Sequence, residues 1–184
     1  MSEPPSKPCR IILLGMMGSG KSTVGSLLAK RTGWPFHDND ALLQELFDAT
    51  PRQILATGDE TSLLAAEVAA LRAGLQRPAP SVVAAAGGTI VDAAAREAMT
   101  ESGVRIWLRI TPETILQRSS GGEHRPWPDA DRAAWIARAV AHRHDLYASM
   151  ADLTLDADDS TPSDLADRIL AHARATGACA PMMD

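Results

Sequence analysis

The chain has 184 residues, of which 45% are apolar and 22% charged, and its formal net charge is −5. These values are typical of one globular domain with its own core, and they argue against a general binder of nucleic acids or acidic membranes. No apolar run reaches the length of a membrane span, and the polar leader "MSEPPSKPCR" lacks the apolar segment of a signal peptide. We therefore expect a cytoplasmic protein with a single domain over residues 1–184, whose ends at 1–9 and 175–184 are prone to disorder.

The only cysteines, Cys9 and Cys179, stand near opposite ends of the chain. This spacing is not that of a metal site, and cytoplasmic proteins keep most of their thiols reduced. We therefore expect two unpaired thiols.

Short apolar runs alternate with helical periodicity through the first half of the chain. In order, the pattern predicts a strand at 9–15, a helix at 21–33, a strand at 34–40, helices at 41–47, 51–57 and 60–75, and a strand at 80–88. The strands are continuously apolar, which is typical of a parallel sheet covered on both faces.

The second half continues the alternation. The pattern predicts a helix at 93–102, a strand at 103–110, a helix from 111, a mobile lid loop at about 119–131, a long helix at 131–150, a strand at 151–157 and a helix at 163–173. The predicted fold class is α/β, with three α/β/α layers around a central five-stranded parallel sheet. Ligands of such folds gather at the carboxyl ends of the strands.

A glycine-rich loop follows the first predicted strand. Gly15, Gly20, Lys21 and Ser22 match the pattern G-x-x-x-x-G-K-[ST], with Gly18 inside it. Such glycines let backbone N–H groups point at phosphate oxygens, while the lysine reaches the β- and γ-phosphates and the serine hydroxyl ligates Mg²⁺. The alternative is an ordinary glycine turn with a surface lysine, but the strand before the loop and the helix after it favour a phosphate-binding loop of the P-loop kinase type.

Two carboxylates end the second predicted strand, in "FHDND". Asp38 and Asp40 are two residues apart, so on a strand their side chains would share one face. Beside a phosphate loop, one carboxylate can hold Mg²⁺ through water while the other orients and partly deprotonates an acceptor hydroxyl. Alternatively, Asp40 caps a helix that begins at Ala41.

The chain resembles the shikimate kinase family, a group of small P-loop kinases, over about residues 10–170. The resemblance depends on "GMMGSGKSTVG", "FHDND", "AGG" before "TIV", "RSSGGEHRP", "HRHDLY" and "DADDSTP", which occur in the family's order. It implies ATP as co-substrate, Mg²⁺ as cofactor and a monomer that acts on a small molecule. On the nucleotide side it implies that Asp38 supports the metal, that Arg118 and Pro162 sandwich adenine, and that the phosphates bind to Gly15, Gly18, Ser19, Gly20, Lys21, Ser22 and Thr23.

On the acceptor side, the resemblance implies that Asp40 is the base and that Gly87 and Gly88 offer backbone N–H groups. Arg125 would close over the transferring phosphate from the lid, and Arg143 would grip the substrate carboxylate. From the residues alone, the two glycines can also form a tight turn and Arg143 a surface salt bridge. We expect Trp34, Trp107 and Trp135 in the core, whereas Trp127 in the lid could cover the acceptor.

One part of the family pattern is missing. A second carboxylate-binding arginine is expected in a stretch like "F-R-x-x-E", but Leu63 stands at about that place in "GDETSLLAAEVAAL", and Ser62 and Leu64 flank it. The first glycine of the family's triple glycine is Ala86. We therefore expect an ATP-dependent kinase for shikimate or a similar hydroxylated molecule. The alternatives are a kinase for another polyol or cyclitol, a nucleotide kinase, and a nucleotide-binding module without turnover.

Overall fold

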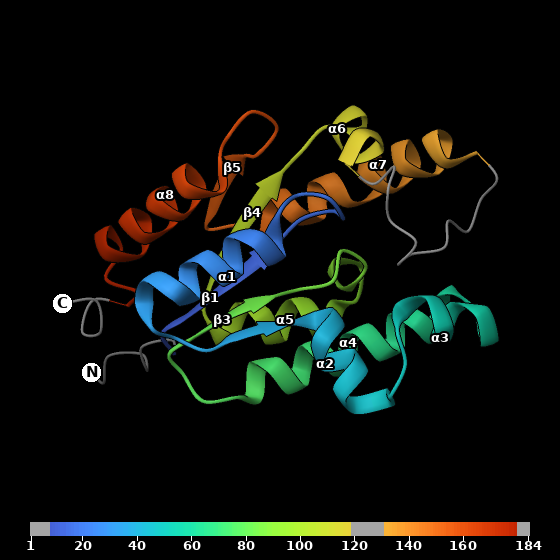
Figure 1. Cartoon of the computed structure of the whole chain (residues 1–184), viewed down its shortest axis with the longest axis horizontal. Helices are drawn as coiled ribbons and strands as arrows, with labels where there is room; N and C mark the ends of the chain where they lie inside the picture. The colour runs from blue at the N-terminus through green and yellow to red at the C-terminus, as the bar shows by residue number, and fades with distance from the viewer. Residues whose placement is uncertain (1–7, 119–130, 180–184) are drawn as a thin grey trace.

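The computed structural model describes residues 8–118 and 131–179, which form a parallel five-stranded sheet with helices on both faces (Figure 1). The strand order is β2-β3-β1-β4-β5. The strands are β1 (Arg10–Leu14), β2 (Phe36–Asp38), β3 (Ser81–Ala84), β4 (Val104–Arg109) and β5 (Leu153–Asp156). The predicted α/β class and five-stranded parallel sheet are confirmed. The lid expected at about 119–131 falls almost entirely outside the described residues and stays a prediction.

The helices divide between the two faces because right-handed crossovers in opposite directions place them on opposite sides of a parallel sheet. Helices α1 and α8 pack against each other on one face, and α4, α5 and α7 cover the other (Figure 1). The helices are α1 (Lys21–Thr32), α2 (Asn39–Phe47), α3 (Pro51–Thr57), α4 (Glu60–Gln76), η1 (Thr89–Val91), α5 (Ala93–Ser102), α6 (Pro112–Arg118), α7 (Arg132–Met150) and α8 (Pro162–Ala175). None of them combines the length and apolar character needed to cross a bilayer.

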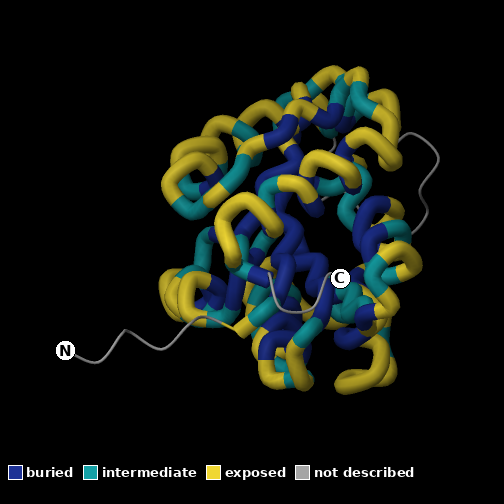
Figure 2. Tube along the Cα trace, turned by 90° about the vertical axis from the view of Figure 1, so that its left-hand side faces the viewer, coloured by how far each residue is buried: buried dark blue, intermediate teal, exposed yellow. Residues whose placement is uncertain are grey.

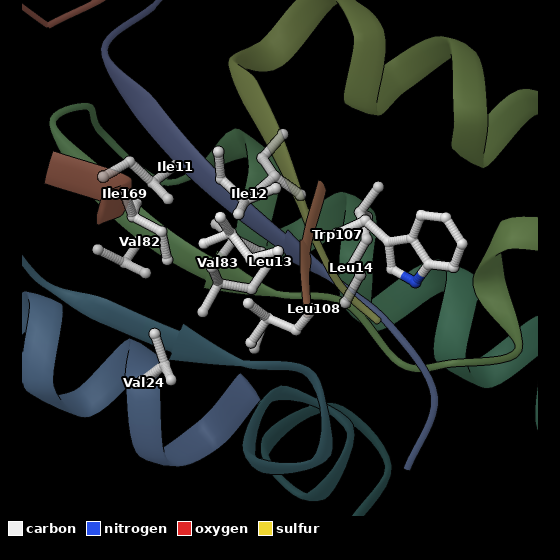
Figure 3. Close-up of a cluster of buried hydrophobic side chains, with 14 of the residues drawn as sticks. Ile11, Ile12, Leu13, Leu14, Val24, Val82, Val83, Trp107, Leu108 and Ile169 are labelled. Atoms are coloured by element: carbon white, nitrogen blue, oxygen red, sulfur yellow. The ribbon is translucent and has the colours of Figure 1, made fainter. Parts of the chain in front are cut away.

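The core lies around β1, the central strand, whose five residues are all buried. β1 pairs with β3 on one side and with β4 on the other, so Leu13 lies between Ala84 and Ile106. Aliphatic side chains of the three strands pack together there (Figure 3), and buried residues run through the middle of the chain trace (Figure 2). The central strands therefore form a rigid base from which the loops at their carboxyl ends extend.

The end of β2 differs from the expectation. The strand stops at Asp38, and Asp38 is the N-cap of α2, where its side chain accepts a hydrogen bond from the Asp40 N–H at 3.0 Å. Asp40 therefore lies in the first turn of a helix and not on a strand. Both predicted placements of Asp40, on the strand and as the cap of the next helix, were wrong, because the cap is Asp38 and the helix begins at Asn39, two residues before Ala41. The roles predicted for the two carboxylates stay predictions.

The two cysteines also differ from the expectation, because Cys9 and Cys179 form a disulfide. Helix α8 runs back from the carboxyl end of β5 to the end of the sheet where β1 begins, which brings the Cα atoms of the two cysteines to 4.9 Å from each other. Separation along the chain therefore did not predict separation in space. A cytoplasmic location stays a prediction, and it loses the support that unpaired thiols would have given.

Candidate functional site

A cavity of about 500 Å³ opens over the carboxyl ends of β1, β2 and β3, and we call it the phosphate-loop cavity. It brings together residues from five separate parts of the chain, all at the edge of the sheet where ligands of α/β folds bind. Its lining includes these residues that the sequence singled out: Gly18, Ser19, Gly20, Lys21, Ser22, Thr23, Asp38, Asp40, Gly87, Arg118 and Pro162.

The phosphate loop has a backbone that requires glycine. Gly15, Gly18 and Gly20 have φ angles of 141°, 76° and 89°, a region that side chains disfavour. At Gly15 a Cβ would also lie 2.6 Å from the carbonyl oxygen of Leu108. Gly15 therefore shapes the loop from behind and does not line the cavity.

Helix α1 begins inside this cavity without a side-chain cap. Its N-cap is Gly20, whereas α2, α3, α4, α5, α7 and α8 each have a side chain that accepts a hydrogen bond from the first turn. The first N–H groups of α1 are therefore open to an anionic ligand, and the positive end of the helix dipole favours one. Lys21 adds a cation at the same place, where its Nζ donates to the carbonyl oxygens of Gly15 (2.8 Å) and Met16 (2.9 Å).

The metal-binding residues expected from the sequence are in direct contact. The Ser22 hydroxyl donates to Asp38 Oδ2 at 2.6 Å, while Asp38 Oδ1 is the cap of α2. The helix cap thus fixes the carboxylate beside the serine. Asp40, two residues after Asp38, is exposed and lines the same cavity. The carboxylates lie on one side of the cavity and Lys21 on the loop that closes it.

Arg118 and Pro162 come together at the far end of the cavity. The Arg118 guanidinium donates to the carbonyl oxygens of Gly18 (3.3 Å), Ala157 (2.9 Å) and Asp158 (2.7 Å). These bonds hold it between the phosphate loop and the segment that leads to Pro162, the first residue of α8. A flat guanidinium and a proline ring on the same cavity form suitable surfaces for a planar base.

A second cavity of about 350 Å³ lies between α4 and α7, and we call it the α4/α7 cavity. Met17 lines both cavities, and the pair Gly87–Gly88 spans them, because Gly87 lines the first and Gly88 the second. A group in one cavity can therefore reach a group in the other past these residues.

The α7 side of the second cavity carries a cation. The half-buried Arg143 has its Cζ 5.9 Å from the centre of the Trp135 ring, and one of its Nη atoms is 3.6 Å from the sulfur of Met16. Arg143 thus faces the cavity and does not form the surface salt bridge considered above. Trp135 is a cavity wall and only partly a core residue, so its assignment to the core needs correction, whereas Trp34 and Trp107 are buried as expected.

The α4 side of the cavity combines leucine side chains with two glutamates. Leu63 and Leu64 both line it, and Leu64 Cδ1 lies 3.7 Å from where a Cβ on Gly88 would be. Glu67 is buried with its carboxylate against the same glycine, and the exposed Glu60 stands at the start of the helix. Leu64, which faces Gly88 directly, is therefore a second candidate, beside Leu63, for the position at which the sequence predicts a lost arginine.

The first turn of α4 is fixed by Asp59. Its carboxylate accepts hydrogen bonds from the backbone N–H (2.7 Å) and the hydroxyl (2.8 Å) of Ser62. These bonds hold the pKa of the Asp59 carboxyl below its ordinary value.

Several contributors to the site were missed by sequence reasoning. Met17 stands at an unspecified position of the phosphate loop, Leu64 was considered only as a neighbour of Leu63, and Glu67 belongs to no motif that was used; their places depend on how the loop and α4 face the cavity. Tyr147, whose hydroxyl donates to the Gly87 carbonyl oxygen at 2.9 Å, stands in the stretch "HRHDLY" that drew attention only for Arg143. Arg125 and Trp127 lie outside the described residues, so their predicted roles stay predictions.

Known proteins resemble this chain along most of its length. The family model for shikimate kinase matches residues 17–174. Shikimate kinase of Moorella thermoacetica is 34% identical over 152 residues, which is 82% of this chain and 86% of that protein. For shikimate kinase of Geobacter sulfurreducens the identity is 33% over 171 residues, which is 92% of this chain and 93% of that protein.

Solved structures agree with these matches. Shikimate kinase from Acinetobacter baumannii in complex with shikimate superposes with a TM-score of 0.86 at 30% identity, covering 93% of this chain and 95% of that one. A gluconokinase from Sinorhizobium meliloti, at 17% identity and a TM-score of 0.59, shares the fold alone. The family match, the relatives and the phosphate-loop geometry together show that the chain belongs to the shikimate kinase family of ATP-dependent phosphotransferases.

Proposed function

We propose that this chain transfers the γ-phosphate of ATP to a hydroxyl group of shikimate. The observation that carries the proposal is the junction of two cavities at Met17 and Gly87–Gly88, one lined by the phosphate loop and the other by Arg143. A phosphate donor in the first cavity and a ring alcohol in the second would meet at this junction. The structural relative crystallised with shikimate supports this choice of acceptor. We further propose that the enzyme is a cytoplasmic monomer.

The phosphate-loop cavity supplies most of the charge stabilisation. Lys21 and the uncapped N–H groups of α1 would neutralise the β- and γ-phosphates, which costs little reorganisation because the loop backbone is already in place. Arg118 and Pro162 would hold adenine at the far end. Phosphoryl transfer needs chiefly such positioning and electrostatic stabilisation, which the loop provides.

A magnesium ion fits beside the phosphate loop. Mg²⁺ prefers oxygen ligands and keeps several waters, and the hydroxyl of Ser22 lies 2.6 Å from the carboxylate of Asp38. Ser22 would bind the metal directly and Asp38 through water. When bound, the ion would neutralise charge on the transferring phosphate. Within residues 8–118 and 131–179, no group of three or more His, Cys, Asp or Glu side chains is placed to hold a metal ion.

The acceptor side would use one base and one anchor. Asp40 lines the phosphate-loop cavity and would accept the proton of the attacking hydroxyl. The N–H groups of Gly87 and Gly88 would hold the ring, and Arg143 would bind its carboxylate through charge-assisted hydrogen bonds. Arg125 would approach the transferring phosphate from the lid.

A second acceptor class is favoured by the α4 side of the second cavity. Leu63 and Leu64 place apolar surface there, and Glu60 and Glu67 oppose the charge of Arg143. Such a wall disfavours a carboxylate on that side and favours an uncharged ring alcohol. Family membership supports shikimate, whereas this wall supports an uncharged polyol or cyclitol.

Product formation from a panel of acceptors tests the proposal. ADP release with Mg²⁺ and ATP would be measured for shikimate and for uncharged ring alcohols, and ³¹P spectra would identify the phosphorylated product. We expect a shikimate phosphate ester as the main product. Faster turnover of an uncharged ring alcohol, with negligible shikimate phosphate, would replace shikimate by the second acceptor class.

A further inference from the structure

We infer that Tyr147 is a positioning residue that keeps the α4/α7 cavity aligned with the phosphate loop. The inference relies on the proposed function, because it assigns the second cavity to the acceptor. It concerns a contact between α7 and the turn after β3, in which Tyr147 binds the carbonyl of a glycine whose N–H group would hold the acceptor.

The hydrogen bond from Tyr147 fixes a buried turn. Gly87 is buried and lies between the end of β3 at Ala84 and the start of η1 at Thr89, so its carbonyl is not part of the strand ladder. The Tyr147 hydroxyl donates to this carbonyl oxygen at 2.9 Å. A buried carbonyl needs a partner, so the phenol determines where the Gly87–Gly88 turn lies.

The same contact borders the phosphate loop. A Cβ on Gly87 would lie 3.3 Å from the carbonyl oxygen of Gly15, 3.6 Å from the Cα of Met16 and 3.6 Å from the Tyr147 hydroxyl. Three segments therefore meet in van der Waals contact at one glycine. Tyr147 joins the helix to the glycine turn by a hydrogen bond, at the point where that turn borders the phosphate loop.

Helix α7 carries Tyr147 and Arg143 on one face, one turn apart. Arg143 reaches the sulfur of Met16 while Tyr147 binds the glycine turn, so the two residues hold the helix to the site at two points. A small rotation of α7 would therefore displace Arg143 and the glycine N–H groups together, but would leave the phosphate loop where β1 and α1 hold it.

The tyrosine ring has little freedom to move. It is 3% exposed and stacks on Trp107, with ring centres 5.5 Å apart and planes at 17°. Trp107 comes from β4 and is part of the buried core, with its indole at the edge of the cluster drawn in Figure 3. The stacked pair holds the phenol hydroxyl in a fixed place, so replacing tyrosine by phenylalanine removes the hydrogen bond but keeps the packing.

The test compares Tyr147→Phe with Ser149→Ala, a matched control on the same helix. Ser149 also donates a hydroxyl hydrogen bond, to the Leu146 carbonyl oxygen, but it is exposed and away from the site. We expect Tyr147→Phe to raise the KM of shikimate by about tenfold and the KM of ATP by no more than about twofold. The control should change neither. Equal increases in both KM values, or no change in either, would overturn the inference.

A measurement without substrate separates this inference from the choice of acceptor. Hydrogen exchange of the Gly87 and Gly88 amides should be about tenfold faster in Tyr147→Phe than in Ser149→Ala, with exchange in β1 unchanged. Exchange that is unaltered, or faster throughout the chain, would show that Tyr147 has no local role. If wild-type enzyme does not phosphorylate shikimate, the acceptor proposal fails, and the exchange result alone decides the role of Tyr147.

Discussion

The two cavities that meet at Gly87–Gly88 are built in different ways. The part of the phosphate-loop cavity that would bind phosphate consists of consecutive residues, with backbone groups held by glycines at positive φ. The α4/α7 cavity depends on side chains from α3, α4, η1 and α7, which are distant in sequence. A cavity of backbone groups accepts one kind of ligand, whereas single substitutions in a cavity of side chains can change the ligand. We infer that the loop determines the phosphate donor, whereas substitutions in the second cavity can change which acceptor binds.

The largest expected effect is in the phosphate-loop cavity. Lys21→Ala should abolish phosphoryl transfer, by at least about a thousandfold in kcat, because the variant loses the cation beside the transferring phosphate. The fold should survive, since Lys21 is a partly exposed charge and not a core residue. Steady-state kinetics and circular dichroism would check both statements. Lys30→Ala, in the last turn of the same helix, is the control and should keep normal turnover. Near-normal activity of Lys21→Ala with any acceptor would reject our assignment of the loop.

Asp40→Asn should lower kcat by about 10²–10⁴-fold and change ATP affinity much less. The amide is nearly isosteric with the carboxylate, so the shape of the wall persists while the base is lost. Kinetics together with ATP titration would separate the two effects, with Asp48→Asn at the other end of α2 as the control. A loss of ATP binding as large as the loss of rate would make Asp40 a metal ligand.

Leu63→Arg tests whether the apolar wall replaces a carboxylate site. If shikimate is the acceptor, the wild-type KM should be unusually high. The new cation should then raise kcat/KM for shikimate by about 10–100-fold, which corresponds to one charge-assisted contact. Leu64→Arg should give the larger gain, because Leu64 is the leucine beside Gly88. Leu46→Arg, on an exposed side chain of α2, is the control.

The same variants distinguish the two acceptor classes. With an uncharged native acceptor, the new arginine would lack a partner and would narrow the cavity, so the native reaction should weaken. Efficient phosphorylation of shikimate by wild-type enzyme, unimproved by either arginine, would show that neither leucine occupies the carboxylate site.

The smallest effect is expected at the start of α4. Asp59→Ala removes the cap of this helix and should lower the melting temperature by about 2–4 °C, with kcat/KM unchanged. Because the folded-state pKa of Asp59 is lowered, its contribution to stability is complete above the unfolded pKa and is lost as pH falls through the folded pKa. The melting difference between wild type and variant should therefore disappear in acid. A change in acceptor KM would show that the cap also shapes the cavity.

The sequence predicted the sheet and the phosphate loop well, because both follow from local patterns. The apolar run of β1 and the spacing from Gly15 to Ser22 each fit in a window of a few residues. Asp40 was assigned to the right cavity but to the wrong local structure, whereas Asp38 ends the strand as predicted. The reason is that a capping aspartate and a strand aspartate differ only in which residue begins the helix.

The second cavity was less predictable because it depends on orientation. Successive helix residues point about 100° apart, so a sequence cannot decide between Leu63 and Leu64 when no motif fixes the register of α4. Trp135 was assigned to the core for a similar reason. A tryptophan that lines a cavity and a tryptophan in the core both stand among apolar residues, so the sequence does not distinguish them. The contact of Tyr147 with Gly87 could not be predicted without knowing that α7 packs against the turn after β3.

The Cys9–Cys179 bridge has a mechanical consequence. It closes nearly the whole chain into a covalent ring, so tension applied to the two ends passes through the sulfur atoms and does not shear β1 from its neighbours. A protein pulled from its termini would therefore extend only by the segments outside the bridge until the bond is reduced. After reduction, the same tension would act directly on the central strand, and the phosphate loop at its end would be among the first parts to be displaced.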